Sequence, residues 1–151
     1  MMIKQIFILL FVMTSYMHGA DILTLVSLLD RNDTATFESQ IQSLQDANSV
    51  REDNNKTILM YASWVGNMDA VKYLVEKGAD VTAQDIGGAT ALHLAIWKGY
   101  TPIALYLLEK GASGHIMSKD GLTPLDIAGM RGNKEVSSAI EKATLKLKPL
   151  L

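Results

Sequence analysis

Three six-residue stretches follow one another at a fixed distance along the chain: Thr57-Ile-Leu-Met-Tyr-Ala62, Thr90-Ala-Leu-His-Leu-Ala95 and Thr123-Pro-Leu-Asp-Ile-Ala128. Their first residues stand 33 positions apart in both steps. The same step relates further small and apolar positions: Leu59, Leu92 and Leu125; Gly66, Gly99 and Gly132; Leu74, Leu107 and Ile140; and the pairs Gly78-Ala79 and Gly111-Ala112. A period of this length is typical of proteins that stack one small structural unit on the next.

Each unit has the pattern of two helices. In the first half of a unit, Leu92 and Ala95 stand three residues apart and share one helical face. In the second half, apolar residues at 70, 71, 74 and 75 form a second stripe at helical spacing. Gly66 and Gly78 follow the two halves, where a glycine ends a helix at low cost. The sequence therefore predicts two short helices per unit.

This pattern resembles the ankyrin repeat, which has about 33 residues, a β-turn, two helices and a T-P-L-H signature. The resemblance covers residues 52 to 143. It implies an all-α solenoid of stacked helix-turn-helix units with β-turn fingers. We expect a degenerate N-terminal capping repeat at 21–51, repeats at 52–84 and 85–117, and a C-terminal capping repeat with a tail at 118–151. Three repeats and a cap meet the minimum that a solenoid needs for stability.

Two departures from the family pattern stand out. His93 is the signature histidine, whereas Met60 and Asp126 take its place in the neighbouring units. The resemblance implies a Thr–His hydrogen-bond network, which we expect to be weaker in those two units. The last unit has Ser137 and Glu141 where the others are apolar, and a polar outer face is typical of a terminal capping repeat.

The expected N-terminal cap contains two apolar clusters and one capping residue. One helix would bury leucines at 25, 28 and 29, and a second would bury Phe37, Ile41 and Leu44. Asp33 is a predicted N-cap residue for the second helix.

The first twenty residues have the layout of a secretory signal peptide. Lys4 precedes an unbroken apolar run from Ile6 to Met13, and the small pair Gly19-Ala20 ends the segment. A spanning helix needs about 20 apolar residues, so we expect no membrane anchor. We expect cleavage near Ala20 and a periplasmic or secreted protein, free of disulfides because it has no cysteine. The alternative is a buried N-terminal helix of the fold.

Charge and composition argue against several kinds of chemistry. The net charge is -2 and the pI about 5.9, without the basic clusters that nucleic acid requires. His93 and His115 have no acidic residue at metal-ligand spacing. Asp53, Asp85 and Asp120 lie near the turns of separate units, where turn hydrogen bonding explains them. We therefore expect no catalytic site, metal or cofactor, and no enzyme activity.

The expected binding surface is the concave face formed by the fingers and the first helices. Trp64, Trp97 and Met130 occupy equivalent positions at the exposed end of the first helix, and tryptophan is enriched in interface hot spots. Alternatively, both indoles fold back into the helix layer as core. The predicted protein-binding residues are Trp64, Trp97, Met130, Lys98, Arg131, Tyr100, Asp85, Ile86, Met117, Lys119 and Leu122.

Together these features predict a monomeric, exported module that binds another protein. The most specific hypothesis is an inhibitor, of the self-protection or immunity type, that occludes a co-exported enzyme such as a peptidoglycan hydrolase. The acidic balance favours a basic partner. Two alternatives are a periplasmic scaffold that supports an exported or stress-related enzyme, and an effector that binds a host protein.

Overall fold

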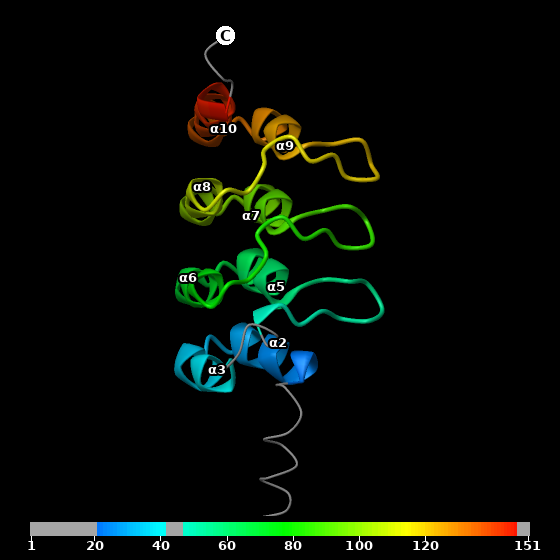
Figure 1. Cartoon of the computed structure of the whole chain (residues 1–151), viewed down its shortest axis with the longest axis vertical. Coiled ribbons are helices and arrows are strands. Elements are labelled where there is room, and N and C mark those ends of the chain that lie inside the picture. The colour runs from blue at the N-terminus through cyan, green and yellow to red at the C-terminus, as the bar shows by residue number, and fades with distance from the viewer. Residues whose placement is uncertain (1–20, 42–46, 148–151) are drawn as a thin grey trace, which may run out of the picture.

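The computed structural model describes residues 21–41 and 47–147, which form a single stack of helix pairs (Figure 1). The first helices of the pairs are α2 (Ile22–Asp30), α5 (Ile58–Val65), α7 (Ala91–Lys98) and α9 (Pro124–Met130). The second helices are α3 (Thr34–Gln40), α6 (Met68–Glu76), α8 (Thr101–Glu109) and α10 (Lys134–Leu147). The expected all-α solenoid is confirmed. The signal peptide expected at 1–20 and Leu44 of the expected cap lie outside the described residues.

The two kinds of helix form two parallel columns, and the fingers project from the column of first helices (Figure 1). Each finger is a hairpin-like loop in which a backbone hydrogen bond joins the two ends. In these bonds, the N–H groups of Arg51, Asp85 and Ser118 donate to the carbonyl oxygens of Lys56, Ala89 and Leu122, over 3.0, 2.9 and 2.9 Å. Apart from one isolated bridge between Val50 and Thr57, the described residues contain no β-structure.

Consecutive fingers are also bonded to one another. The N–H of Ile86 donates to the carbonyl of Asn54 over 2.9 Å, and the N–H of Lys119 donates to the carbonyl of Gly87 over 2.8 Å. These bonds join main-chain atoms only. The fingers are therefore aligned with one another through backbone atoms.

The core follows the repeat. Ala62, Ala95 and Ala128 are completely buried where first helices stack, and the small side chain lets neighbouring helices approach closely. Leu59 and Leu92 are equally buried on the same face of α5 and α7. No helix within residues 21–41 and 47–147 combines the length and the apolar character that a bilayer span requires.

The N-terminal pair α2 and α3 packs in the same way as the later pairs. Leu25, Leu28, Leu29, Phe37 and Ile41 are all buried. The N-cap predicted for the second helix is confirmed, since Oδ1 of Asp33 accepts the N–H of Thr36 over 3.1 Å.

The second helix of this pair is shorter than expected, because α3 ends one residue before Ile41. The hydroxyl of Tyr73 in α6 reaches the end of this helix. It lies 3.0 Å from the carbonyl oxygen of Glu38 and 3.2 Å from that of Ile41, so it can donate to either. A hydrogen bond from the next unit thus compensates for the early helix end.

The first helices of the repeats all begin with a closed capping box. In α5, Met60 N–H donates to Oγ1 of Thr57, and the sulfur of Met60 accepts the N–H of Thr57 at 3.4 Å. In α9, the carboxylate of Asp126 accepts from both the N–H and the hydroxyl of Thr123, at 2.9 and 2.6 Å. These bonds lower the pKa of Asp126. The box at Asp126 is therefore closed by a strong acceptor. The weaker network expected in this unit stays a prediction, since His93 also lies 3.3 Å from a carbonyl oxygen of the next finger through Nε2.

Candidate protein-binding surface

Three equivalent side chains of the first helices point away from the core. Trp64 in α5, Trp97 in α7 and Met130 in α9 are 40%, 47% and 68% exposed. Trp64 follows the buried Leu59 by five residues, which places the two side chains about 140° apart around the helix. The alternative that both indoles belong to the core is therefore wrong.

Two lysines lie over the first of these tryptophans. Nζ of Lys98 stands 4.5 Å from the ring centroid of Trp64, and Nζ of Lys56 stands 5.9 Å from it. Both lie within the distance at which a cation is attracted to an aromatic face. Lys98 comes from the next repeat, so this contact also joins α5 to α7.

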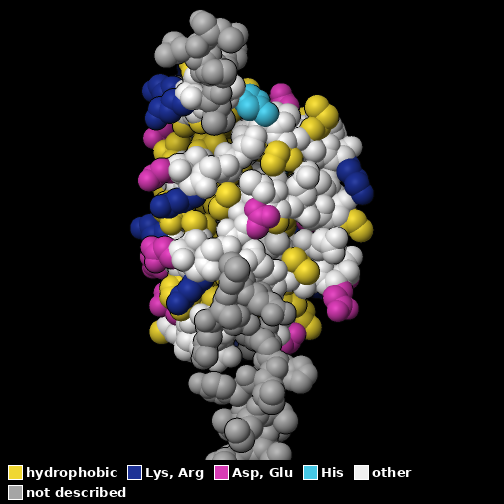
Figure 2. All heavy atoms as spheres, viewed as in Figure 1, with side chains coloured by type: hydrophobic (Ala, Val, Ile, Leu, Met, Phe, Trp, Pro, Cys, Tyr) yellow, Lys and Arg dark blue, Asp and Glu magenta, His cyan; other side chains and the backbone are white. Residues whose placement is uncertain are grey.

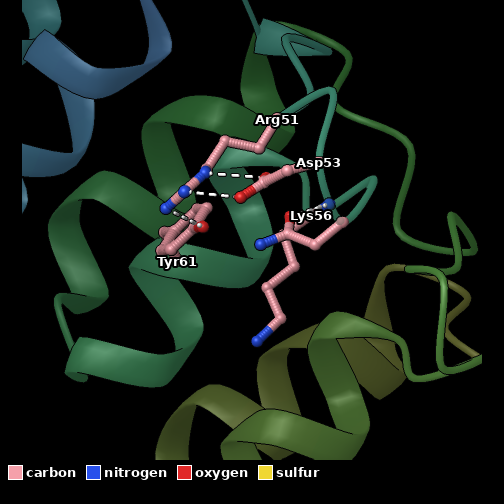
Figure 3. A network of polar contacts seen from close by, with 5 residues as sticks. Arg51, Asp53, Lys56 and Tyr61 are labelled. Atoms are coloured by element: carbon pink, nitrogen blue, oxygen red, sulfur yellow. Dashed lines mark hydrogen bonds and ion pairs between the residues drawn. The ribbon is translucent and has the colours of Figure 1, made fainter.

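The first finger is fastened to its own helix by an arginine (Figure 3). The guanidinium of Arg51 forms two hydrogen bonds with the carboxylate of Asp53, at 2.9 and 2.6 Å, and a third with the hydroxyl of Tyr61 at 3.3 Å. The bond to Asp53 is the main cause that raises the pKa of Arg51. Figure 3 shows Lys56 extending from the same finger. Asp53 is therefore occupied by an intramolecular ion pair.

A cavity of about 310 Å³ lies between the second and third fingers and the first helices. It is lined by Trp64, Asp85, Gly87, Ala89, His93, Leu94, Trp97, Ser118, Asp120, Leu122 and Ile127. The cavity therefore brings together four of the predicted residues: Trp64, Trp97, Asp85 and Leu122. The other seven predicted residues do not line it.

These seven residues lie in several other places. Ile86 and Met117 are 59% and 63% exposed on the second and third fingers, where Lys119 is exposed as well. Met130 lines a shallow hollow beside α9 and α10. Lys98 covers Trp64, and Arg131 is exposed close to Gly99.

Tyr100 is the predicted residue whose position differs most from expectation. It is half-buried, and its ring packs against Gly66 of the preceding repeat. Gly66 has no side chain, so the ring fills the space that a side chain would take. Tyr100 thus contributes to the packing between repeats and offers only part of its surface to solvent.

His93 forms the floor of the cavity and is only 3% exposed. Nδ1 lies 3.0 Å from the N–H of Thr90 and 2.9 Å from its hydroxyl, while Nε2 lies 3.3 Å from the carbonyl of Leu122. A neutral ring with its proton on Nε2 satisfies all of these contacts. Burial is the main cause that lowers the pKa of His93, which favours this neutral form. The imidazole therefore supports the finger and adds no charge to the cavity.

Comparison with known protein families decides what kind of stack this is. A family model for ankyrin repeats, with three copies, matches residues 23–117. The chain belongs to the ankyrin-repeat family. No curated protein matches the chain. Ankyrin repeats are protein–protein interaction modules and are generally not catalytic.

The ankyrin-repeat stack extends beyond the matched segment. Helices α9 and α10 follow residue 117 and pack on α7 and α8 in the arrangement of the earlier pairs (Figure 1). Charged side chains of both signs alternate along the edge formed by the second helices (Figure 2). Within the described ranges, no three histidine or acidic side chains are grouped closely enough to hold a metal ion.

Sequence reasoning missed two residues that line the cavity. Asp120 lines the cavity but is equivalent to Gly87, so periodicity gave no signal for it. His93 lies at the cavity because its Nε2 contacts the carbonyl oxygen of Leu122, a contact between repeats.

Proposed function

We propose that this ankyrin-repeat protein is exported and binds a partner protein in the groove between its fingers and first helices. The observation that carries the proposal is the exposed pair Trp64 and Trp97, which line one cavity together. Exposed tryptophans beside a hollow are the usual centre of a protein interface. Export is supported by the signal-like sequence of residues 1–20.

We further propose that binding occludes the partner and thereby inhibits it. The fingers and the first helices form one side of the stack, and repeat stacks bind partners through extended faces of this kind, so a bound partner would have part of its surface covered. The net charge of -2 favours a basic partner. An enzyme that degrades an anionic cell-wall polymer has this character, so a co-exported peptidoglycan hydrolase is the first candidate.

A capture experiment tests the binding site. The purified protein, with an affinity tag at its C-terminus, is used as bait in extracts of exported proteins beside the variant Trp64→Ala/Trp97→Ala. Leu145→Ala is the matched control, because Leu145 is a 67% exposed apolar residue on a second helix, away from the fingers. We expect one protein to be retained by the unchanged bait and by the control, and lost with the double variant. Equal capture by all three baits would contradict the proposed site.

An activity titration tests the consequence of binding. The captured enzyme is assayed with increasing amounts of the ankyrin-repeat protein. We expect activity to fall to its minimum at a fixed molar ratio, and the double variant to have no effect. If activity rises or lasts longer instead, the protein is a supporting scaffold and the inhibitor proposal is wrong.

A further inference from the structure

The cavity beside Trp97 has an unusual combination of linings. Its charged side chains are two carboxylates, Asp85 and Asp120, which come from consecutive fingers. His93 is neutral, and neither Lys56 nor Lys98 contributes to the lining. The cavity therefore combines an aromatic side with a negatively charged side.

The two tryptophans differ in what covers them. Trp64 already has Lys98 over its ring at 4.5 Å. One repeat later, Arg131 stands in the sequence position of Lys98 and Trp97 in that of Trp64. The guanidinium of Arg131 lies beside Gly99, where a Cβ added to the glycine would be 3.7 Å from Nη2. Among the described residues, no lysine or arginine is placed over the Trp97 ring. This second indole is thus an aromatic surface without a cation.

The carboxylates retain free acceptor capacity. Oδ1 of Asp85 accepts the N–H groups of Gly87 and Ala89 over 2.8 and 2.9 Å and so holds the finger in shape. Oδ2 of Asp85 accepts no hydrogen bond from the part of the chain that the structure describes. Asp120 is exposed at the third finger. Both can accept from a donor that enters the cavity.

We infer that this cavity receives an arginine side chain of the partner protein, with the guanidinium between Trp97 and the two carboxylates. A guanidinium is flat, stacks on indole rings and donates in pairs to carboxylates, so it matches both sides of the cavity. Its positive charge complements Asp85 and Asp120. The inference rests on the proposed function, since it names the chemistry of the partner residue that enters the groove.

Nuclear magnetic resonance with a short peptide tests the inference directly. The protein contains two tryptophans and therefore gives two indole N–H signals, which Trp64→Phe assigns. Acetyl-Gly-Arg-Gly-amide is titrated beside the same peptide with citrulline, which has nearly the shape of arginine but no charge. We expect a saturable shift of the Trp97 signal and about fivefold weaker binding of the citrulline peptide. Equal binding of both peptides, or no shift at Trp97, would overturn the inference.

A double variant without the two negative charges tests whether the carboxylates bind the arginine. Asp85→Asn/Asp120→Asn removes both negative charges, and the asparagine at 85 keeps the oxygen that accepts from Gly87 and Ala89. Asp53→Asn is the control, because Asp53 is a finger carboxylate outside the cavity. We expect the double variant to bind the arginine peptide at least about fivefold more weakly and the control to bind within about twofold of the unchanged protein. Unchanged binding by the double variant would refute the assignment.

The peptide titration and the capture experiment fail independently. If a partner is captured through the tryptophan pair but the arginine peptide does not bind, the proposed function stands and the arginine pocket is wrong. If the peptide binds but no protein is captured, the affinity of the cavity for arginine stands, whereas the proposed function and the assignment of the arginine to a partner protein are wrong.

Discussion

The ring of Tyr100 covers Gly66 of the preceding repeat so closely that a Cβ on Gly66 would lie 2.5 Å from Cζ of the ring. Gly66 also has a positive φ of 84°, a conformation that other residues adopt at a cost. Gly99 is its equivalent one repeat later, with φ of 82°, and a Cβ on Gly99 would have its nearest neighbour 3.7 Å away. The two glycines therefore share a backbone conformation and differ in their surroundings.

Substitution of the two glycines should separate these effects. We expect Gly99→Ala to lower the free energy of unfolding by about 1 kcal/mol, the cost of the left-handed backbone. Gly66→Ala should cost about 3 kcal/mol, because the ring of Tyr100 must also move. Urea unfolding followed by circular dichroism measures both. In the double variant Gly66→Ala/Tyr100→Ala, the loss should be smaller than the sum of the single losses, and strict additivity would show that the ring is not the obstacle.

Removal of one buried hydroxyl should stabilise the protein. Ser63 is completely buried in α5, and its Oγ has no hydrogen-bond partner among the described residues. An unsatisfied buried polar group costs free energy, so Ser63→Ala should raise the free energy of unfolding by about 1 kcal/mol. Thermal and urea unfolding would both report the gain. A loss of stability would show that the hydroxyl has a partner after all.

The amide of Asn67 joins two units. Its Oδ1 caps α6 by accepting the N–H of Ala70 at 2.9 Å, and its Nδ2 donates to Oδ1 of Asn32 and Oγ1 of Thr34 at 3.0 and 3.2 Å. Asn67→Asp keeps the cap but loses both donors. The hydroxyl of Thr34 can turn and donate to the aspartate, whereas the carbonyl oxygen of Asn32 is left facing it. We therefore expect this variant to lower the free energy of unfolding by about 1 kcal/mol, measured by urea unfolding.

The equivalent substitution in the last repeat is the control. Asn133 donates from Nδ2 to the hydroxyl of Thr101 at 2.7 Å. A hydroxyl can turn and donate to the aspartate, whereas the carbonyl oxygen of Asn32 cannot. Asn133→Asp should therefore change stability by less than about 0.5 kcal/mol, since its hydrogen bond is kept. An equal loss in both variants would contradict the role given to Asn32.

His93 should make the stability depend on pH near neutrality. Its pKa is lowered in the folded protein, mainly by burial, from an ordinary value of 6.5. Above pH 6.5 the ring is neutral in the folded and in the unfolded protein, and the contribution of His93 to the free energy of unfolding is fully present. As the pH falls below 6.5, the unfolded chain takes up a proton that the folded protein resists, so the free energy of unfolding decreases until the folded pKa is passed.

Urea unfolding between about pH 7.5 and 5.5 measures this decrease while most carboxylates stay ionised. His93→Met should remove most of it, because Met60 already closes the same capping box in the first repeat. His115→Gln is the control, since His115 is exposed, and it should retain the decrease. A pH dependence that persists in His93→Met would assign it to other groups.

The helical architecture was predictable because it depends on features that the 33-residue period exposes directly. Gly66 ends α5 as expected, and the equivalent Gly99 ends α7. Thr57, Thr90 and Thr123 are the N-caps of the three first helices. The capping box was harder to predict, because its requirement is an acceptor atom at one position and not a histidine. Asp126 meets that requirement with a carboxylate, and Met60 meets it more weakly with a thioether.

The candidate binding surface was only partly predictable. Helical register correctly placed Trp64 and Trp97 outside the core, because that depends on angle around one helix. The position of Tyr100 depends on the absence of a side chain at Gly66, and the contact of Lys98 with Trp64 joins two repeats. The repeat period aligns equivalent positions of different units. A contact between repeats joins positions that are not equivalent, so the period does not reveal it.

The main-chain bonds between consecutive fingers have a consequence for how such a protein can change. Asp53, Ile86 and Lys119 occupy equivalent finger positions with an acidic, an apolar and a basic side chain. The bonds from Ile86 to Asn54 and from Lys119 to Gly87 use backbone atoms, so they do not depend on these side chains. Mutation can therefore change the side chains at these finger positions, and with them the choice of partner, while the main-chain bonds between the fingers are kept.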